Sequence, residues 1–108
     1  MKITLRKEQS VLDYARDHAN SRAAFSGWLT ALGNADWDGP QDIRHTFRTV
    51  DIIASERVVF NIGGNNFRMI CSYRFGPKKS YLFVKWIGTH DEYNKLCDRK
   101  EQYTISMY

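Results

Sequence analysis

Four side chains in the second half of the chain could together bind a phosphodiester and move a proton: Arg68, Lys85, His90 and Tyr93. A histidine with an ordinary pKa of about 6.5 acts as a general acid or base at neutral pH. An arginine guanidinium offers phosphate oxygens a planar pair of donors. Tyr93 follows His90 by three residues, so in a helix both lie on one side. A lone histidine is more often structural, but this setting favours chemistry on a phosphodiester.

The positive charge of the chain is concentrated around these residues. The 108 residues contain 16 Lys and Arg against 12 Asp and Glu, a net charge of +4. Residues 1–54 hold seven basic and seven acidic residues, whereas residues 55–108 hold nine and five. The 34 residues from Arg57 to His90 include six Lys or Arg and no acid. This segment could be a solvated face of a small domain, but the absence of acids favours a surface that binds phosphates.

Three runs in this segment alternate as β-strands do: Arg57–Ile62, Phe67–Phe75 and Ser80–Ile87. Gly63–Asn66 and Gly76–Lys79 separate them with residues typical of turns. These runs and turns predict an antiparallel meander, and tight turns fix the register of its strands. The expected pairs are Ile62 with Phe67, Asn61 with Arg68, Val59 with Ile70, Arg57 with Ser72, Phe75 with Ser80, Cys71 with Val84, Met69 with Trp86, and Ile70 with Lys85.

This register divides the side chains between two faces of the predicted sheet. The apolar face, expected to be the core, carries Val58, Phe60, Ile62, Phe67, Met69, Cys71, Tyr73, Leu82, Val84 and Trp86. The other face carries Arg57, Asn61, Arg68, Ser72, Arg74, Tyr81 and Lys85. We expect this basic face to be exposed to solvent. Arg68 and Lys85 would be diagonal neighbours there, and their like charges would favour a shared anion.

The remaining patterns predict the elements that position these residues. Residues 2–6 alternate as a first strand, and apolar spacing predicts helices over about 7–18 and from Asn20 or Ser21 to Gly33-Asn34. Pro40 begins a short helix that reaches about Thr46. Thr89 and Glu92 form a capping box for a last helix over about 90–98. The sequence predicts one α+β domain over 1–108, with the N-terminal helices on one face of an antiparallel-rich sheet.

Other classes of protein and site fit the sequence less well. No apolar run approaches the ~20 residues that span a bilayer, and the N-terminus is too polar for a secretory signal. Cys71 and Cys97 are too few for a disulfide scaffold, so we expect a cytoplasmic protein with reduced thiols. Neither zinc-binding spacing nor clustered carboxylates occur, so no metal or cofactor is expected. His18 and His45 are interpreted as structural.

Three stretches carry a resemblance to a known family. They are Arg57-Val-Val-Phe-Asn61-Ile-Gly-Gly-Asn65-Asn-Phe-Arg68, Trp86-Ile-Gly-Thr-His90-Asp-Glu-Tyr93, and Ala35-Asp36-Trp37 with Pro40-Gln-Asp-Ile43. The chain resembles HigB-type toxins of bacterial toxin–antitoxin modules, within the RelE-like superfamily, over nearly its whole length. The resemblance implies an endoribonuclease that cuts mRNA, usually on the ribosome. It also implies a cognate helix-turn-helix antitoxin.

The resemblance further implies roles for single residues. Arg68 matches the arginine that stabilises the phosphate, Tyr93 matches the C-terminal tyrosine, and His90 stands near a basic position of relatives. Arg57 and Asn61 stand where some relatives have lysine, which leaves the general base open. The expected reaction is a metal-independent attack of the ribose 2′-OH on the adjacent phosphate. The residues expected to bind RNA are Arg57, Asn61, Arg74, Lys78, Lys79 and Lys85. A non-catalytic RNA- or ribosome-binding module is the alternative, and a degenerate toxin is a third possibility.

Overall fold

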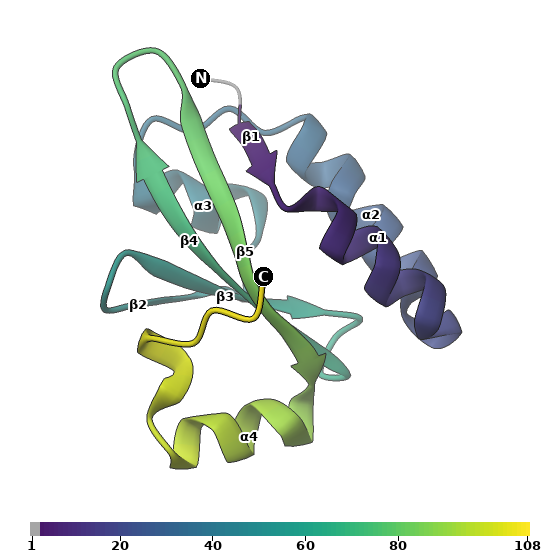
Figure 1. Ribbon diagram of the computed structural model, residues 1–108. Coiled ribbons are helices and arrows are strands. Elements are labelled where there is room, and N and C mark those ends of the chain that lie inside the picture. The colour runs from purple at the N-terminus through teal and green to yellow at the C-terminus, as the bar shows by residue number, and fades with distance from the viewer. Residues whose placement is uncertain (1–2) are drawn as a thin grey trace.

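A five-stranded sheet organises the protein, which the computed structural model describes over residues 3–108 (Figure 1). The strand order is β1-β5-β4-β3-β2. β1 runs parallel to β5, and every other neighbouring pair is antiparallel. The predicted α+β class is therefore confirmed. The strands are β1 Ile3–Arg6, β2 Asp51–Ile53, β3 Arg57–Ile62, β4 Phe67–Phe75 and β5 Ser80–Thr89.

Helices form where the apolar spacing and the capping residues predict them. They are α1 Glu8–Asp17, α2 Arg22–Gly33, α3 Pro40–Thr46 and α4 His90–Asp98. The predicted capping box begins α4: Thr89 Oγ1 accepts from Glu92 N at 3.2 Å, and Glu92 Oε1 accepts from Thr89 N at 2.8 Å. The three-residue strand β2 was not predicted, because it is too short to show alternation. Each helix of residues 3–108 is too short or too polar to cross a lipid bilayer.

The larger hydrophobic cluster joins α1, α2 and α3 to one face of the sheet. Val11 of α1, Phe25 of α2 and Ile43 of α3 are at most 1% exposed. They share this cluster with alternate residues of the strands, as the predicted apolar face requires. The strand residues of the cluster are Val58, Phe60, Ile62, Phe67, Met69, Cys71, Leu82, Val84 and Ile87.

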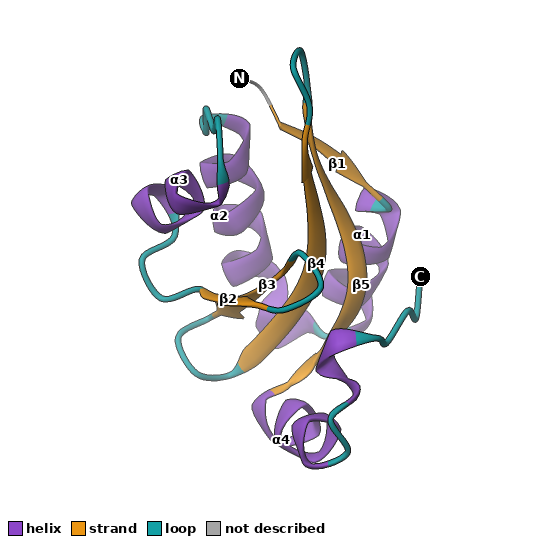
Figure 2. Ribbon diagram, turned by 90° about the vertical axis from the view of Figure 1, so that its left-hand side faces the viewer, coloured by secondary structure: helices purple, strands orange, loops and turns teal. Residues whose placement is uncertain are grey.

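A smaller cluster covers part of the opposite face. It contains Val59, Ile70 and Trp86 of the sheet and Leu96 of α4, with Tyr93 and Ile105 packed against it. Figure 2 shows α4 at the end of the molecule away from the turn between β4 and β5, and the chain that follows it turns back, so that the Met107 amide donates to the Lys85 carbonyl of β5. The expectation of a fully exposed basic face is therefore wrong, because α4 and the C-terminal segment bury part of it.

A β-bulge in β5 explains why Trp86 lies on this second face. The register shifts between Ile70, which pairs with Trp86, and Cys71, which pairs with Val84, so Lys85 is the extra residue. The expected pairs Met69 with Trp86 and Ile70 with Lys85 are wrong, whereas the pairs across β3 and β4 are confirmed. The extra residue moves Trp86 out of the larger core and brings Ile87 into it.

The bulge also separates the two cations expected to be neighbours. Arg68 pairs with Gly88, three residues beyond Lys85 along β5. The diagonal contact between Arg68 and Lys85 was predicted from a register without the extra residue, and it is wrong. A shared anion between these two side chains is therefore not supported by the register.

Candidate functional site

Arg68 lies near the start of β4, between Asn61 of β3 and Gly88 of β5. Its side chain is 7% exposed and donates from Nη2 to Asn65 Oδ1 and from Nη1 to the Phe67 carbonyl, both at 3.1 Å. Within residues 3–108, no carboxylate forms an ion pair with this guanidinium. A buried cation without an anionic partner is costly, and a bound phosphate would offset that cost.

Asn65 was not among the predicted site residues, although it belongs to the stretch that carries the resemblance. It lies in the turn between β3 and β4 and holds Arg68 by the hydrogen bond just described. The signal that could have identified it is its spacing of three residues before Arg68, because a turn of this length brings its side chains back beside the start of the next strand.

His90 begins α4, one residue after Thr89, which pairs with Phe67 at the start of β4. The His90 amide donates to the Asn66 carbonyl at 3.0 Å, which joins α4 to the turn beside Arg68. Asn94 Nδ2 lies 3.3 Å from His90 Nε2, and His90 Nδ1 is buried without a hydrogen-bond partner among the described residues. An amide donor at Nε2 favours the tautomer with its proton on Nδ1. In that tautomer the buried Nδ1–H has no acceptor among residues 3–108.

Tyr93 lies one helical turn beyond His90 and packs against Trp86, with ring centroids 6.1 Å apart. Burial raises the pKa of the Tyr93 hydroxyl well above its usual value, and a hydrogen bond with Cys97 and the charge of Asp51 raise it further. The positive charge of Arg68 acts on this pKa in the opposite direction. Tyr93 is therefore a neutral hydroxyl at physiological pH.

The structure thus brings Arg68, His90 and Tyr93 together where β5 continues into α4, and we call these three residues the β5–α4 site. Within residues 3–108, no group of three or more His, Cys, Asp or Glu side chains could hold a metal ion.

Arg57 and Asn61, expected to bind RNA, are occupied by contacts within the protein. Arg57 is 7% exposed, and its Nη1 donates to the carbonyls of Ile105 at 2.7 Å and Gln102 at 3.3 Å. Burial lowers the pKa of its guanidinium, which nevertheless stays charged. Asn61 Nδ2 donates to the Thr49 carbonyl at 2.8 Å. In this conformation both side chains hold the chain around the β5–α4 site.

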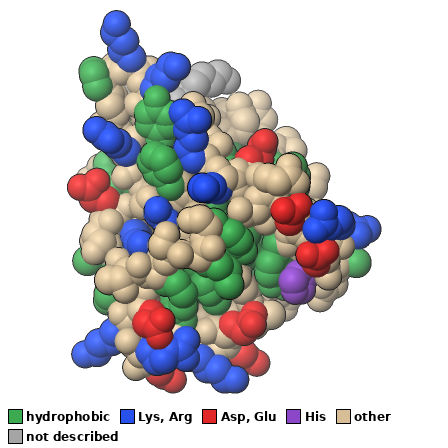
Figure 3. Space-filling model, viewed as in Figure 1, with side chains coloured by type: hydrophobic (Ala, Val, Ile, Leu, Met, Phe, Trp, Pro, Cys, Tyr) green, Lys and Arg blue, Asp and Glu red, His purple; other side chains and the backbone are tan. Residues whose placement is uncertain are grey.

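Of the other predicted RNA-binding residues, Arg74, Lys78 and Lys79 lie at the β4–β5 hairpin, at the opposite end of the sheet from α4 (Figure 1), whereas Lys85 lies midway along β5 at the bulge. Arg74, Lys78 and Lys79 are exposed, and Lys85 is half-buried. Figure 3 shows Lys and Arg side chains around hydrophobic ones in this upper part of the molecule. A hollow of about 620 Å³ is lined here by Arg6, Arg74, Gly76, Pro77, Lys78, Lys79, Tyr81 and Phe83. We call the six charged and aromatic members of this set the hairpin surface.

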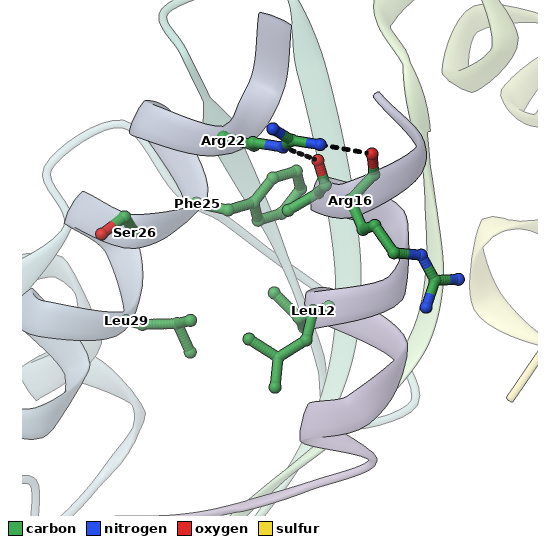
Figure 4. Close-up of a pocket in the computed structure, with 8 residues that line it drawn as sticks. Leu12, Arg16, Arg22, Phe25, Ser26 and Leu29 are labelled. Atoms are coloured by element: carbon green, nitrogen blue, oxygen red, sulfur yellow. Dashed lines mark hydrogen bonds between the residues drawn. The ribbon is translucent and has the colours of Figure 1, made fainter. Parts of the chain in front are cut away.

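A second hollow, of about 320 Å³, lies between α1 and α2 (Figure 4). Apolar side chains such as Phe25 and Leu29 line it, and Arg22 closes its edge. Arg22 donates from Nε to the Ala15 carbonyl at 3.1 Å and from Nη2 to the Arg16 carbonyl at 2.9 Å. None of the predicted site residues lines this hollow.

Comparison with known proteins identifies the family of this chain. Residues 21–96 match the HigB toxin family, described as the RelE-like toxic component of a toxin–antitoxin system. The chain belongs to the HigB toxin family. The match includes all of β2 to β5 and α4 as far as Leu96, and therefore the whole β5–α4 site.

A curated relative agrees with this assignment to the HigB toxin family. The chain is 32% identical over 84 residues to a protein named mRNA interferase HigB from Escherichia coli O6:H1. The aligned part covers 76% of this chain and 80% of that relative. The family resemblance predicted from the sequence is therefore confirmed.

Proposed function

We propose that this HigB family toxin is an endoribonuclease that cleaves mRNA on the ribosome and so inhibits translation. The observation that carries the proposal is the buried Arg68, which forms no ion pair with a carboxylate of residues 3–108 and pairs with Gly88, two residues before α4 begins. The relative named mRNA interferase HigB supports this choice of substrate. Messenger RNA and ribosomes would place its action in the cytoplasm, under the control of a helix-turn-helix antitoxin.

The proposed reaction is a transesterification without a metal ion. The ribose 2′-oxygen attacks the adjacent phosphorus and loses its proton, and the bond from phosphorus to the 5′-oxygen breaks. The leaving 5′-oxygen gains a proton, so the products are a 5′-hydroxyl end and a 2′,3′-cyclic phosphate or, after hydrolysis by water, a 3′-phosphate. Arg68 stabilises the negative charge that develops on the phosphate. The His90 imidazole transfers a proton, as general base or general acid, and Tyr93 orients or stacks a nucleobase.

The hydrogen bonds of Arg57 and Asn61 within the protein change the role proposed for them. Their side chains bind the carbonyls of Ile105 and Thr49 and so position the segments around the site. Arg74, Lys78, Lys79 and Lys85 are proposed to bind RNA phosphates farther from the chemistry, because they are exposed or half-buried on the hairpin.

Induction of the protein in growing bacteria, followed by mapping of new mRNA 5′ ends, tests the proposal. We expect new 5′ ends with wild type and at least a hundredfold fewer with Arg68→Ala or His90→Ala, because each removes a group that acts in the transition state. His45→Ala is the matched control, since His45 is an exposed histidine on α3. Purified protein that has been treated with EDTA, and then freed of it before ribosomes are added, should cleave as well as untreated protein.

Two results would contradict the proposal. New 5′ ends absent with wild type, while the protein still binds ribosomes, would favour the non-catalytic binding module. Cleavage unchanged by both Arg68→Ala and His90→Ala would remove the β5–α4 site from the reaction. Thermal unfolding of each variant establishes that a loss of cleavage is not a loss of fold.

A further inference from the structure

Two aromatic side chains lie together on the hairpin half of β5, away from the larger core. The rings of Tyr81 and Phe83 have centroids 6.0 Å apart and planes inclined by 28°. Leu82 and Val84, which alternate with them, are fully buried in the larger cluster. Because successive side chains of a strand point to opposite faces, Tyr81 and Phe83 face away from α1, α2 and α3. Both rings are half-buried rather than covered.

Cations from both neighbouring strands flank these rings. Arg6 of β1 pairs with Phe83, and its guanidinium carbon lies 5.5 Å from the centre of the Tyr81 ring. Arg74 of β4 pairs with Tyr81 from the other side. Lys85 Nζ lies 6.0 Å from the centre of the Phe83 ring. The parallel pairing of β1 with β5 therefore adds an arginine from the start of the chain to a face built mainly from the second half.

Among the described residues that line the 620 Å³ hollow at this surface, none is Asp or Glu. Four cations, Arg6, Arg74, Lys78 and Lys79, surround one hollow, and like charges held close together repel each other. Volumes of about 300–1,000 Å³ are typical of small-molecule sites, and a stacked nucleobase is within that size. The hairpin surface thus has room, positive charge and aromatic faces together.

The presence of both cations and aromatic rings favours one class of anionic ligand over another. An acidic peptide would use the cations, but its carboxylates offer no flat aromatic surface to stack on two neighbouring rings. Single-stranded nucleic acid uses both, because the phosphates track a positively charged groove and the bases stack on aromatic side chains. We propose that the hairpin surface is a second RNA site, which binds a single-stranded RNA segment with bases on Tyr81 and Phe83 and phosphates near Arg6 and Arg74. This proposal rests on the proposed function for its choice of RNA.

The second site is separate from the cleavage chemistry. Arg74, which pairs with Tyr81, lies six residues along β4 from Arg68, which pairs with Gly88. At ~3.3 Å per residue the two pairs are about 20 Å apart. The RNA segment could come from the mRNA itself or from ribosomal RNA, which offer the same chemistry. Binding there would hold the toxin on its substrate without contact at the scissile bond.

The proposal is tested by fluorescence anisotropy, which measures the binding of a labelled single-stranded RNA 12-mer. All variants are made in an Arg68→Ala/His90→Ala background, called the parent, so that the RNA is not cleaved during the measurement. We expect Tyr81→Leu and Phe83→Leu each to weaken binding about five- to a hundredfold, because each removes one stack. Tyr81→Phe keeps the ring and should stay within about twofold of the parent. A plot of the logarithm of the binding constant against the logarithm of the salt concentration measures how many phosphates are contacted. In the double variant Arg6→Gln/Arg74→Gln its slope should become shallower by about 1.4, roughly 0.7 for each lost phosphate contact. Arg16→Gln, which removes an exposed arginine of α1, is the control.

The outcomes separate this proposal from the proposed function. Wild-type cleavage together with parental RNA affinity in both leucine variants overturns the second site and leaves the endoribonuclease intact. Weakened binding in the leucine variants, without any wild-type cleavage, supports the second site and contradicts the endoribonuclease. An acidic peptide that binds the parent and both leucine variants equally, and displaces the RNA, identifies a peptide site and overturns the proposal.

A photo-crosslinking amino acid in place of Tyr81 identifies the source of the RNA and does not depend on the fold of the leucine variants. After crosslinking on translating ribosomes, sequence reads from mRNA or from ribosomal RNA assign the segment, and either result supports the site. Crosslinks confined to ribosomal proteins overturn it.

Discussion

The indole of Trp86 lies directly over Gly88. A Cβ atom added at Gly88 would come within 2.4 Å of two carbons of the Trp86 ring. Gly88 is also the residue of β5 that pairs with Arg68. The bulge at Lys85 turns Trp86 to this face, and the missing side chain at Gly88 leaves room for the indole. Trp86 and Gly88 therefore join the packing beneath α4 to the part of β5 that pairs with β4 at Arg68.

Gly88→Ala should destabilise the protein by about 1–3 kcal/mol, because the buried indole of Trp86 must move to accommodate the new methyl group. Urea unfolding measures this cost. In a Trp86→Leu background the same substitution should cost much less, since the smaller side chain no longer lies over position 88. An equal cost in both backgrounds would contradict the contact.

Arg57→Met should loosen the C-terminal segment, because it leaves the carbonyls of Ile105 and Gln102 without their donor. The expected cost is about 1–3 kcal/mol. Hydrogen exchange at the Met107 amide, which donates to the Lys85 carbonyl at 2.8 Å, should become faster. Arg48→Met, at an exposed arginine, is the control. An unchanged Met107 exchange rate would show that Arg57 does not hold this segment.

Thr89→Ala should cost about 1 kcal/mol, because it removes the side-chain acceptor at the N-terminus of α4. Cleavage should fall with it, since α4 carries His90 and Tyr93. Thr30→Ala, which removes an exposed hydroxyl within α2, is the matched control. The role of the cap would be refuted by equal losses of stability in the two variants.

Tyr14→Phe should make the alkaline loss of stability less steep. Burial, followed by the charges of Glu92 and Tyr108, raises the pKa of Tyr14 to about 12. The unfolded chain releases this proton near pH 10, whereas the folded protein retains it. The stability from this group is therefore complete below about pH 10 and is lost as the pH rises towards 12.

Free energies of unfolding between pH 9 and 11.5 measure the effect, with the exposed Tyr103→Phe as control. At neutral pH the Tyr14→Phe variant should unfold within about 1 kcal/mol of wild type, because the Tyr14 hydroxyl is buried with no hydrogen-bond partner among the described residues. A parallel pH profile for wild type and Tyr14→Phe would exclude the raised pKa as a source of alkaline instability.

The sequence by itself determined the meander, the apolar face of β3 and β4, and the start of α4. These features are local, since a strand alternates every two residues and the capping box of Thr89 and Glu92 needs only one helical turn. The same local patterns, with the family resemblance, led to Arg68, His90 and Tyr93 as the candidate site. Their roles in cleavage stay predictions.

Only the tertiary structure decided which side chains of the second face reach solvent. One extra residue, Lys85, moved Trp86 to that face. The alternation of residues within β5 cannot reveal this bulge, because a bulge is defined by the pairing of β5 with β4. The burial of Arg57 depends on carbonyls 45 and 48 residues away, and Arg6 reaches the Tyr81 ring because β1 joins β5 in parallel. Contacts between distant segments follow from how the whole chain packs, so they lie outside any local pattern.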